Sequence, residues 1–515
     1  MNTSDFKYVM KNYMGIDIGT SGCKAVVFDQ NGTQTAAAYR EYDLISPQTG
    51  WAELDPDEVI QKCFQVITEA ASKTQPESIA ALGISSQGEA FTAIDKNGKA
   101  LCNALVSSDI RAAHYARSWT AKFGKDRLYK ITGHTAHPMF SLFKLLWLRD
   151  NRPEIWAGAQ KFLCFEDLLQ FRLGLQPAIG WPLAARTMLF DVISHRWSKH
   201  ILDAVGIKPV RLATPVRSGS IAGTVDHVIA KKLRLAPGAF VVTGGHDQPC
   251  SALGAGVTQP GIAAYAAGTV ECITPAFKKP VFTNSLRKNN LCTYDYTVPG
   301  MYTTVAFSLT GGNLLKWFRN QFGSAEVAQA KKLRISPYEL LLKQVPDKPS
   351  ALLVLPYFTP TGTPYFDPCA TGAIIGLTLS TTKPDIIRAL LEGVALEMRL
   401  NLDILEQSGC KVDELRAIGG GAKSHIWNQL KADVIGKKIA VPDITEAGCF
   451  GVAMLAYAAD TRLSVKNIAK DWIKPVSVIL PRPEYQKIYD LKFEKYKHLY
   501  PALKQFFPIA IPENA

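Results

Sequence analysis

Short apolar runs separated by glycine-containing turns open the chain. From Tyr13 onward, the runs MGIDIG, CKAVVFD and TQTAAAYREY are separated by the turns TSG and QNG. Runs of this length between turn residues predict strands, so we expect an antiparallel meander here. A helical pattern over residues 57–71 and a buried strand over 80–85 follow. This alternation predicts a mixed α/β fold for the first half of the chain.

The second half of the chain begins as the first half does. A mainly helical region over residues 112–212 separates the two beginnings, and a strand at 240–243 runs into Gly244-Gly245-His246-Asp247. Beyond it we expect strands at 261–266, 270–274 and 415–418, a turn at Gly268-Thr269, and helices at 383–407 and up to residue 435. The repetition predicts two related domains that face each other across a cleft.

Composition narrows the class of protein. The 515 residues are 47% hydrophobic and 20% charged, which is typical of a globular chain. No apolar run reaches the roughly 18 residues of a membrane span, and residues 1–12 do not read as a secretory signal. The ten cysteines form no CxxC pair and no Cys/His cluster, which disfavours structural zinc. We therefore expect a cytoplasmic protein.

The chain is basic, with 58 Lys and Arg against 45 Asp and Glu and a net charge of +13. Such an excess is compatible with nucleic acid, an anionic membrane or an anionic small molecule. The basic residues are scattered, and no RNA-binding or zinc-finger pattern accompanies them. We therefore expect small-molecule ligands, no nucleic acid and no membrane partner. Should the protein be an enzyme, a homodimer is the expectation, because dimers are the common default for soluble enzymes.

The octapeptide from Asp17 to Lys24 lies in the tight turn of the first predicted hairpin. Its glycines let backbone N–H groups approach an anion, and its hydroxyl groups and Lys24 add donors for phosphate oxygens. Asp17 is placed to bind a magnesium ion, usually through water. An ordinary hairpin turn has the same composition, and the pattern is neither a P-loop nor GxGxxG.

Asp247 follows the predicted strand at 240–243, at a glycine-rich turn that opens a helix. Reactive groups are commonly displayed at such positions in α/β sheets, and a carboxylate there could accept a proton from a substrate hydroxyl. A helix N-cap is the competing interpretation. We assign no role to the neighbouring His246, because a single histidine beside glycines is more often a structural residue.

Three further polar segments are weaker candidates. Gln87 and Glu89 follow the strand at 80–85 and could bind vicinal hydroxyls, although a polar loop without a role is equally common. Asp109 and Arg111 could form a local ion pair near the surface. The turn Gly419-Gly420-Gly421-Ala422 follows a strand and could let an adenine or ribose ring lie on the backbone.

Two longer motifs connect these turns. Residues 139–151 fit the pattern M-x-S-x-x-K-L-x-W-L-x-D-N, and residues 372–377 fit G-x-I-x-G-L, followed by D-I-x-x-A-L-L-E at 385–392. With these motifs and the turns in this order, the chain resembles the FGGY carbohydrate kinases of the actin, heat-shock-ATPase and hexokinase superfamily. The resemblance spans about residues 13–460.

The resemblance implies two ribonuclease-H-like domains that close around ATP, magnesium and a sugar. It implies an N-terminal sugar-binding and catalytic domain over residues 13–255, a nucleotide-binding domain over 256–480 and a C-terminal tail over 481–515. Asp247 would be the catalytic base, and Asp17 the residue associated with magnesium. The implied nucleotide contacts are Gly19, Thr20, Ser21, Lys24, Gly268, Thr269, Gly312, Lys316, Gly420, Gly421 and Ala422. The implied sugar contacts are Gln87, Gly88, Glu89, Asp247 and Gln248.

The substrate is constrained by departures from the family patterns. Many xylulose kinases have Met-His-Gly where this chain has Gln87-Gly88-Glu89, and glycerol kinases have Gln-Arg-Glu. Cys272 stands where glycerol kinases have a phenylalanine that packs on the substrate. The segments at 50–56 and 366–368 resemble the xylulose and gluconate kinase branch. We expect a pentulose such as D-xylulose, with gluconate, a hexulose or a polyol such as erythritol or glycerol as alternatives. A nucleotide-switch ATPase of the same superfamily is the remote alternative.

Overall fold

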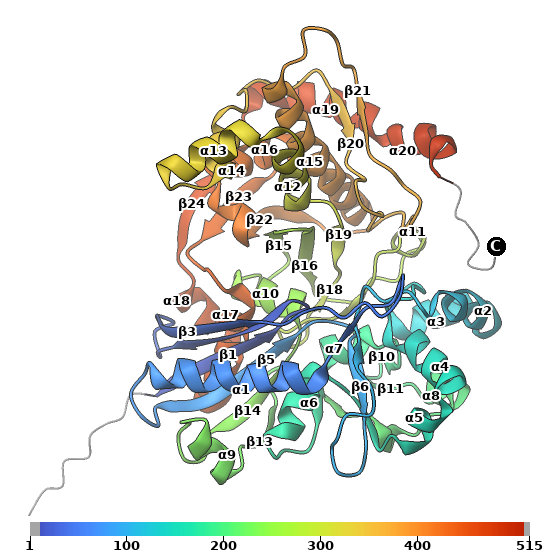
Figure 1. Cartoon of the computed structure of the whole chain (residues 1–515), viewed down its shortest axis with the longest axis vertical. Helices are drawn as coiled ribbons and strands as arrows, with labels where there is room; N and C mark the ends of the chain where they lie inside the picture. Colours follow the sequence, from blue (N-terminus) through green and yellow to red (C-terminus); the bar gives the residue numbers. More distant parts are fainter. Residues whose placement is uncertain (1–10, 509–515) are drawn as a thin grey trace, which may run out of the picture.

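Two large sheets, one from each half of the chain, organise the molecule (Figure 1). The structure is a computed structural model that describes residues 11–508. The first sheet has the order β13-β14-β5-β1-β2-β3. Its strands are β1 (Asn12–Ile18), β2 (Gly22–Phe28), β3 (Gln34–Glu41), β5 (Ile79–Ser86), β13 (Ile221–Thr224) and β14 (Phe240–His246). β1, β2 and β3 pair antiparallel, and β5 runs parallel to both β1 and β14, so the predicted meander and mixed α/β fold are confirmed.

The second sheet repeats the arrangement of the first. Its main path has the order β17-β18-β16-β15-β22-β23-β24, and β19 also pairs with β16. The strands are β15 (Gly261–Ala267), β16 (Glu271–Phe277), β17 (Tyr294–Asp295), β18 (Tyr302–Thr303), β19 (Ala306–Ser308), β22 (Val412–Ile418), β23 (Lys438–Pro442) and β24 (Pro475–Ile479). β15 pairs antiparallel with β16 and parallel with β22, as β1 does with β2 and β5.

The first sheet carries one long covering helix and a helical insertion. Helix α1 (Pro56–Ser72) begins where the Asp55 carboxylate accepts the backbone N–H of Asp57 at 2.9 Å, and its apolar face packs on β2 and β3. The other helices of this half are α2 (Ala113–Phe123), α3 (Lys125–Thr132), α4 (Ser141–Asn151), α5 (Pro153–Gly158), α6 (Phe165–Arg172), α7 (Trp181–Arg186), α8 (Lys199–Val205) and α9 (His227–Lys232). The minor strands are β4 (Glu53–Leu54), β6 (Phe91–Ile94), β7 (Ala104–Leu105), β8 (Lys161–Cys164), β9 (Ala178–Gly180), β10 (Phe190–Asp191), β11 (Arg196–Trp197) and β12 (Thr214–Val216).

A 25-residue helix, α15 (Lys383–Gln407), forms the centre of the second half. Thr382 and Asp385 cap its start reciprocally, and most of its residues from Ile387 onward are buried. The neighbouring helices are α11 (Asn284–Lys288), α12 (Gly312–Phe322), α13 (Ser324–Leu333), α14 (Pro337–Lys343) and α16 (His425–Ile435), and the hairpin β20 (Leu353–Leu355) and β21 (Ala373–Ile375) packs beside them. Within residues 11–508, no helix is both long and apolar enough to cross a membrane.

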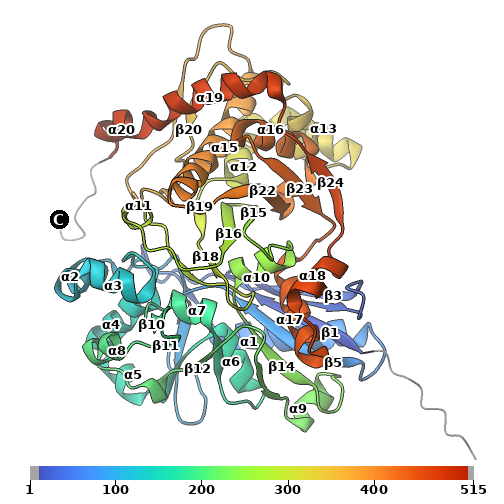
Figure 2. The same ribbon diagram turned by 180° about the vertical axis from the view of Figure 1, so that it is seen from behind.

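Two helices connect the halves. Helix α10 (Asp247–Gly254) follows β14, and α17 (Ala447–Thr461) packs on it and on β1, β5 and β14 of the first sheet. Figure 2 shows α17 and α18 (Val465–Trp472) among the blue strands of the first half, although both come late in the chain. A Cβ atom at Gly15 would lie 1.8 Å from the carbonyl oxygen of Cys449, so the close approach of α17 to β1 requires glycine there.

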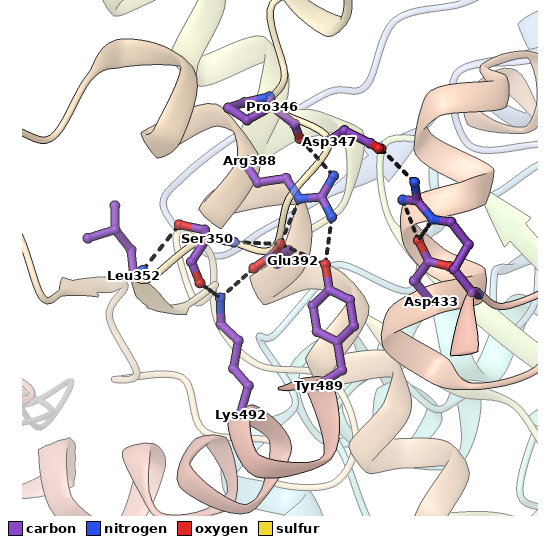
Figure 3. A network of polar contacts seen from close by, with 10 residues as sticks. Pro346, Asp347, Ser350, Leu352, Arg388, Glu392, Asp433, Tyr489 and Lys492 are labelled. Carbon is purple, nitrogen blue, oxygen red and sulfur yellow. Dashed lines mark hydrogen bonds and ion pairs between the residues drawn. The ribbon is translucent and has the colours of Figure 1, made fainter. Parts of the chain in front are cut away.

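The C-terminal segment is part of the second domain's packing. Helices α19 (Pro483–Lys497) and α20 (Leu499–Leu503) follow β24. The Glu392 carboxylate of α15 accepts the Tyr489 hydroxyl at 2.9 Å and pairs with Arg388 at 2.6 Å and with Lys492 (Figure 3). Because Glu392 and Arg388 are both buried, this network fixes α19 on α15, in a segment to which the sequence assigns no role.

Candidate functional site

Asp17 and Asp247 come together at the carboxyl ends of parallel strands. Asp17 lies near the end of β1 and accepts the Ser85 hydroxyl at 2.8 Å. Burial, followed by repulsion from Asp247, raises the pKa of Asp17 to about 6, while the Ser85 hydrogen bond and Lys24 oppose the shift. Two carboxylates this close favour a cation between or beside them.

Asp247 is the first residue of α10, and its carboxylate is oriented by a histidine. His246, at the N-cap position, makes no side-chain capping bond, so neither residue acts as a side-chain cap. Nε2 of His246 lies 3.1 Å from Oδ1 of Asp247, and its Nδ1 lies 3.0 Å from the Tyr294 hydroxyl. The histidine that sequence reasoning set aside is therefore a direct neighbour of the candidate base.

A buried glutamate holds the turn that carries Asp247. Glu166 of α6 accepts the backbone N–H of Gly244 at 2.8 Å and that of Gly180 at 2.9 Å. Burial raises the pKa of Glu166 to about 8, and the backbone donors oppose the shift. No motif in the sequence indicates this residue, because its partners lie on segments far apart in the chain.

The loop after β5 carries the predicted sugar contacts. The Gln87 amide donates to the carbonyl of Gly19 at 2.9 Å, and its oxygen accepts the Thr20 hydroxyl at 3.2 Å. Gln87 therefore joins the first phosphate-type turn to this loop. Glu89 has a left-handed backbone, with φ of 63°, and its carboxylate pairs with Arg186. Gln248 lies next to Asp247 in α10 and is partly exposed.

An ion pair joins the end of the first turn to the start of α17. Lys24 binds Glu446, which directly precedes α17, at 2.7 Å. Gly19, Thr20 and Lys24 are partly exposed and Ser21 is exposed, although the Thr20 hydroxyl and the Lys24 ammonium already have protein partners. A Cβ atom at Gly448 would lie 3.2 Å from Cγ of Asp17, which places the start of α17 beside the same carboxylate.

The second half brings its predicted glycine turns together. The backbone N–H of Gly312, at the start of α12, donates to the carbonyl of Gly268 at 2.9 Å. A Cβ atom at Gly421 would lie 3.0 Å from Cβ of Ala267, so the 419–422 turn is adjacent to this hairpin. Gly268, Thr269 and Gly420 are exposed, Gly421 is partly exposed and Ala422 is buried. Lys316 is exposed one turn into α12.

A fully buried ion pair lies under the second turn. Lys431 of α16 binds Glu271, the first residue of β16, at 2.7 Å, and neither side chain is exposed. A Cβ atom at Gly311 would lie 2.8 Å from Cγ of Glu271, which places the pair directly beneath the Gly268 and Gly312 turns. Sequence reasoning missed both charged residues, because neither lies in a recognisable motif.

Cys272 connects the two sides of the site. This residue of β16 is buried, and its thiol has a pKa raised to about 12, by burial first and then by the Asp247 carboxylate, while Arg186 opposes the shift. At this residue the second sheet therefore lies close to Asp247 and Arg186, on the side of the predicted sugar contacts.

A cavity of about 620 Å³ lies elsewhere, beside Arg416 and α18, and none of the predicted site residues lines it.

Asp109 and Arg111 are a local ion pair, as one interpretation of the sequence proposed, but they are not near the surface. Arg111 pairs with Asp109 at 2.7 Å and with Glu53 at 2.6 Å, and these side chains are almost completely buried. The guanidinium lies 3.6 Å from the ring centroid of Trp51. The cluster therefore fixes the loop at residues 109–111 on β4.

Within residues 11–508, no group of three or more His, Cys, Asp or Glu side chains could hold a metal ion by itself. Asp17 nevertheless fits a magnesium ion that retains most of its water ligands. The ion needs one or two carboxylates together with substrate phosphates. The repulsion that Asp17 experiences from Asp247 is the local charge that such an ion would neutralise.

Comparisons with known proteins agree over nearly the whole chain. Residues 12–254 match the model of the FGGY family of carbohydrate kinases, N-terminal domain, and residues 263–459 match that of the C-terminal domain. The chain is 30% identical to a gluconokinase of Bacillus subtilis over 90% of this chain and 91% of that protein. It is 27% identical to a xylulose kinase of the same organism, over 95% and 97%. A ligand-bound xylulose kinase from Lactobacillus acidophilus has the same fold, with a TM-score of 0.87 and 24% identity over 96% and 99% of the two chains.

Proposed function

Because the chain belongs to the FGGY family of carbohydrate kinases, we propose that it transfers the γ-phosphate of ATP to a hydroxyl of a pentulose such as D-xylulose. The carbohydrate kinase activity and the use of ATP follow from the family. The substrate, the roles of individual residues and the use of magnesium are parts of the proposal. The observation that carries it is the pairing of Asp247 with His246 beside Asp17, at the ends of the two strands, β14 and β1, that flank β5.

In this proposal Asp247 is the general base. Its carboxylate takes the proton of the attacking hydroxyl while the hydroxyl oxygen bonds to the γ-phosphorus and the bond to the β-phosphate oxygen breaks, releasing ADP. His246 holds Oδ1 of Asp247 at 3.1 Å and so leaves the other carboxylate oxygen for the substrate. Phosphoryl transfer needs positioning and charge neutralisation more than covalent chemistry, so one base on a fixed turn suffices.

The proposed nucleotide contacts are mainly backbone groups of three turns. The turn at residues 19–21 with Lys24 and the turn at 268–269 would bind phosphate oxygens, and the segment 420–422 would bind adenosine. Gly420 supports this assignment, because a Cβ atom there would meet no protein atom within 4 Å, so protein packing does not require glycine. Magnesium at Asp17 would neutralise charge on the transferred phosphate.

Gluconate is the second candidate substrate, and Arg186 is the observation that favours it. Its guanidinium lies beside the loop after β5 that carries the predicted sugar contacts, and it could bind the carboxylate of the sugar. The similar identities to a gluconokinase and to a xylulose kinase do not separate the two substrates. We also propose a cytoplasmic enzyme, because the reaction consumes ATP.

A coupled ADP-release assay with a substrate panel tests the proposal. The panel contains D-xylulose, L-xylulose, D-ribulose, gluconate, glycerol, erythritol and hexuloses, with mass spectrometry of the product and Asp247→Ala as the control variant. Saturable turnover with one sugar, lost in the variant, is the expected result. Basal ATP hydrolysis that no sugar stimulates and that survives in Asp247→Ala would instead indicate a nucleotide-switch ATPase.

A further inference from the structure

The guanidinium of Arg186 lies beside the loop that carries Gly88 and Glu89, although Arg186 comes from a different part of the chain. It is the last residue of α7, which packs against β14 and β17. A Cβ atom at Gly88 would lie 3.4 Å from Nε of Arg186 and 3.0 Å from Cδ2 of His246. The absence of a side chain at position 88 therefore lets the guanidinium and the imidazole approach the same point of the loop.

The Arg186–Glu89 pair leaves one donor and one acceptor available. Nε and Nη2 of Arg186 both contact the same oxygen, Oε1 of Glu89. Among the residues that the structure describes, Nη1 of Arg186 and Oε2 of Glu89 make no hydrogen bond to the protein. Neither atom is fully buried. Both atoms therefore reach solvent, although the two side chains are only 8% and 3% exposed.

A second buried Arg–Glu pair in the same molecule shows what a purely structural pair looks like. All three guanidinium nitrogens of Arg388 donate to the protein, to Glu392, to the carbonyl of Pro346 and to the Tyr489 hydroxyl (Figure 3). Arg388 and Glu392 are 3% and 1% exposed. The two pairs are thus buried to a similar extent, but only the Arg186–Glu89 pair of these two has polar atoms without a protein partner.

The Arg186–Glu89 pair lies near the candidate base. His246 contacts Asp247 at 3.1 Å and approaches the backbone of Gly88, which is adjacent to Glu89. The Arg186 guanidinium also lies 4.9 Å from the ring centroid of Phe140 and 6.0 Å from that of Tyr294. Aromatic rings therefore form part of the surroundings of the guanidinium.

The chemistry of these two atoms selects a substrate class. Arginine only donates hydrogen bonds, and an ionised glutamate only accepts them. An sp² oxygen on Nη1 has no hydrogen of its own to place, whereas a hydroxyl there also needs an acceptor and competes with the neighbouring hydroxyl for Oε2 of Glu89. A buried donor without a partner costs about 1–3 kcal/mol, which corresponds to roughly ten- to hundredfold in binding.

We propose that Arg186 is a specificity-determining residue that selects sugars with an sp² oxygen next to a hydroxyl. Nη1 of Arg186 donates to the ketone of a ketose or the carboxylate of an aldonate, and Oε2 of Glu89 accepts the neighbouring hydroxyl. Alditols of the same length are discriminated against. This inference rests on the proposed sugar kinase function and names the substrate class of that site.

Matched substrate pairs test the inference. The kcat/KM is measured for D-xylulose against xylitol and for gluconate against D-glucitol, in the wild type, Arg186→Lys and Arg388→Lys. We expect the wild type to prefer the carbonyl or carboxylate member of at least one pair by about tenfold or more. In Arg186→Lys this ratio should fall to within about threefold of one, with the KM for ATP unchanged. Arg388→Lys should lower the melting temperature and leave the ratio unchanged.

The outcomes separate the inference from the function on which it rests. The pair that shows discrimination tells a ketose site from an aldonate site. Equal losses for both members of each pair, or an unchanged ratio in Arg186→Lys, would show that Arg186 is only structural and would overturn the inference alone. Absence of phosphorylation of every sugar by the wild type would overturn both proposals. A destabilised Arg186→Lys protein remains informative, because the ratio is measured on one preparation.

Discussion

The two halves of the molecule contain the same β-hairpin, but the carboxylate near the hairpin turn has different surroundings in each half. At the β1–β2 turn, Asp17 is partly exposed and has another carboxylate, Asp247, as a close neighbour. At the β15–β16 turn, Glu271 is fully buried and neutralised by Lys431. The strand pairing is equivalent, so the difference lies in side chains and not in topology.

This difference shows how one fold can serve two purposes. In our proposal, Asp17 at the first turn and the neighbouring Asp247 remain available to metal and substrate, at the expense of local repulsion. The second turn uses its carboxylate internally, so it presents backbone groups and the Thr269 hydroxyl, but no carboxylate, to a ligand. This contrast supports the proposal that the reacting groups lie in the first half and that the second half binds the nucleotide.

The largest expected effect is on stability and concerns the second turn. Replacing Lys431 with Met leaves Glu271 buried without a cation, which typically costs about 3–5 kcal/mol. Chemical denaturation of Lys431→Met should show a loss of this size, and Lys431→Met with Glu271→Gln should recover most of it. A loss below about 1 kcal/mol in the single variant would mean that the pair is not an internal support of the turn.

Asp17→Asn should have the opposite signature, with lower activity and higher stability. Asparagine can still accept the Ser85 hydroxyl, but it removes the charge proposed to hold magnesium, so turnover should fall about 10²-fold. Because the folded-state pKa of Asp17 is raised to about 6, ionising it destabilises the wild type above that pH. The variant should therefore be more stable by about 1–2 kcal/mol at pH 7.

The pH dependence of this gain checks its origin. The cost of the charge is fully present above about pH 6 and disappears below the ordinary carboxyl value of 3.8. Thermal unfolding of both proteins from pH 4 to 8 should show curves that converge at the acid end. Curves that stay parallel would assign the change in stability to packing, and the contrast between the two turns would lose its electrostatic basis.

The smallest expected effect concerns the backbone surface of the second half. Gly420→Ala adds a methyl group where the protein leaves open space, so the variant should fold normally. A nucleotide lying on this turn would be displaced, and we expect the KM for ATP to rise about tenfold, equivalent to about 1.4 kcal/mol, with the KM for sugar unchanged. Gly158→Ala, another exposed glycine without a positive φ, is the control. An unchanged KM in Gly420→Ala would remove the adenosine contact from this turn.

The fold was largely predictable because its strands and turns are local features. The runs from Tyr13 onward and the glycine turns that follow them have the spacing of strands and hairpins, and the structure has them there. The crossing of α17 back to the first sheet was not predictable. It depends on close contacts such as that of Gly15 with Cys449, which are far apart in sequence.

The site was predictable only where a motif marks it. The structure places Asp17 and Asp247 side by side, as the motifs implied. Arg186, Glu166 and Lys431 act through partners on other segments, so their spacing along the chain carries no signal. Sequence reasoning set His246 aside as a histidine beside glycines that is more often structural, and only the folded geometry shows that it contacts Asp247.

The central claim is that the first half holds the reacting group while the second half binds the nucleotide. Asp247→Asn tests it most directly, with ADP affinity measured by calorimetry and sugar phosphorylation measured on the same preparation. The account predicts ADP affinity within about threefold of wild type and turnover lower by about 10²- to 10⁴-fold. Phosphorylation within about tenfold of wild type, or loss of ADP binding together with turnover, would contradict it.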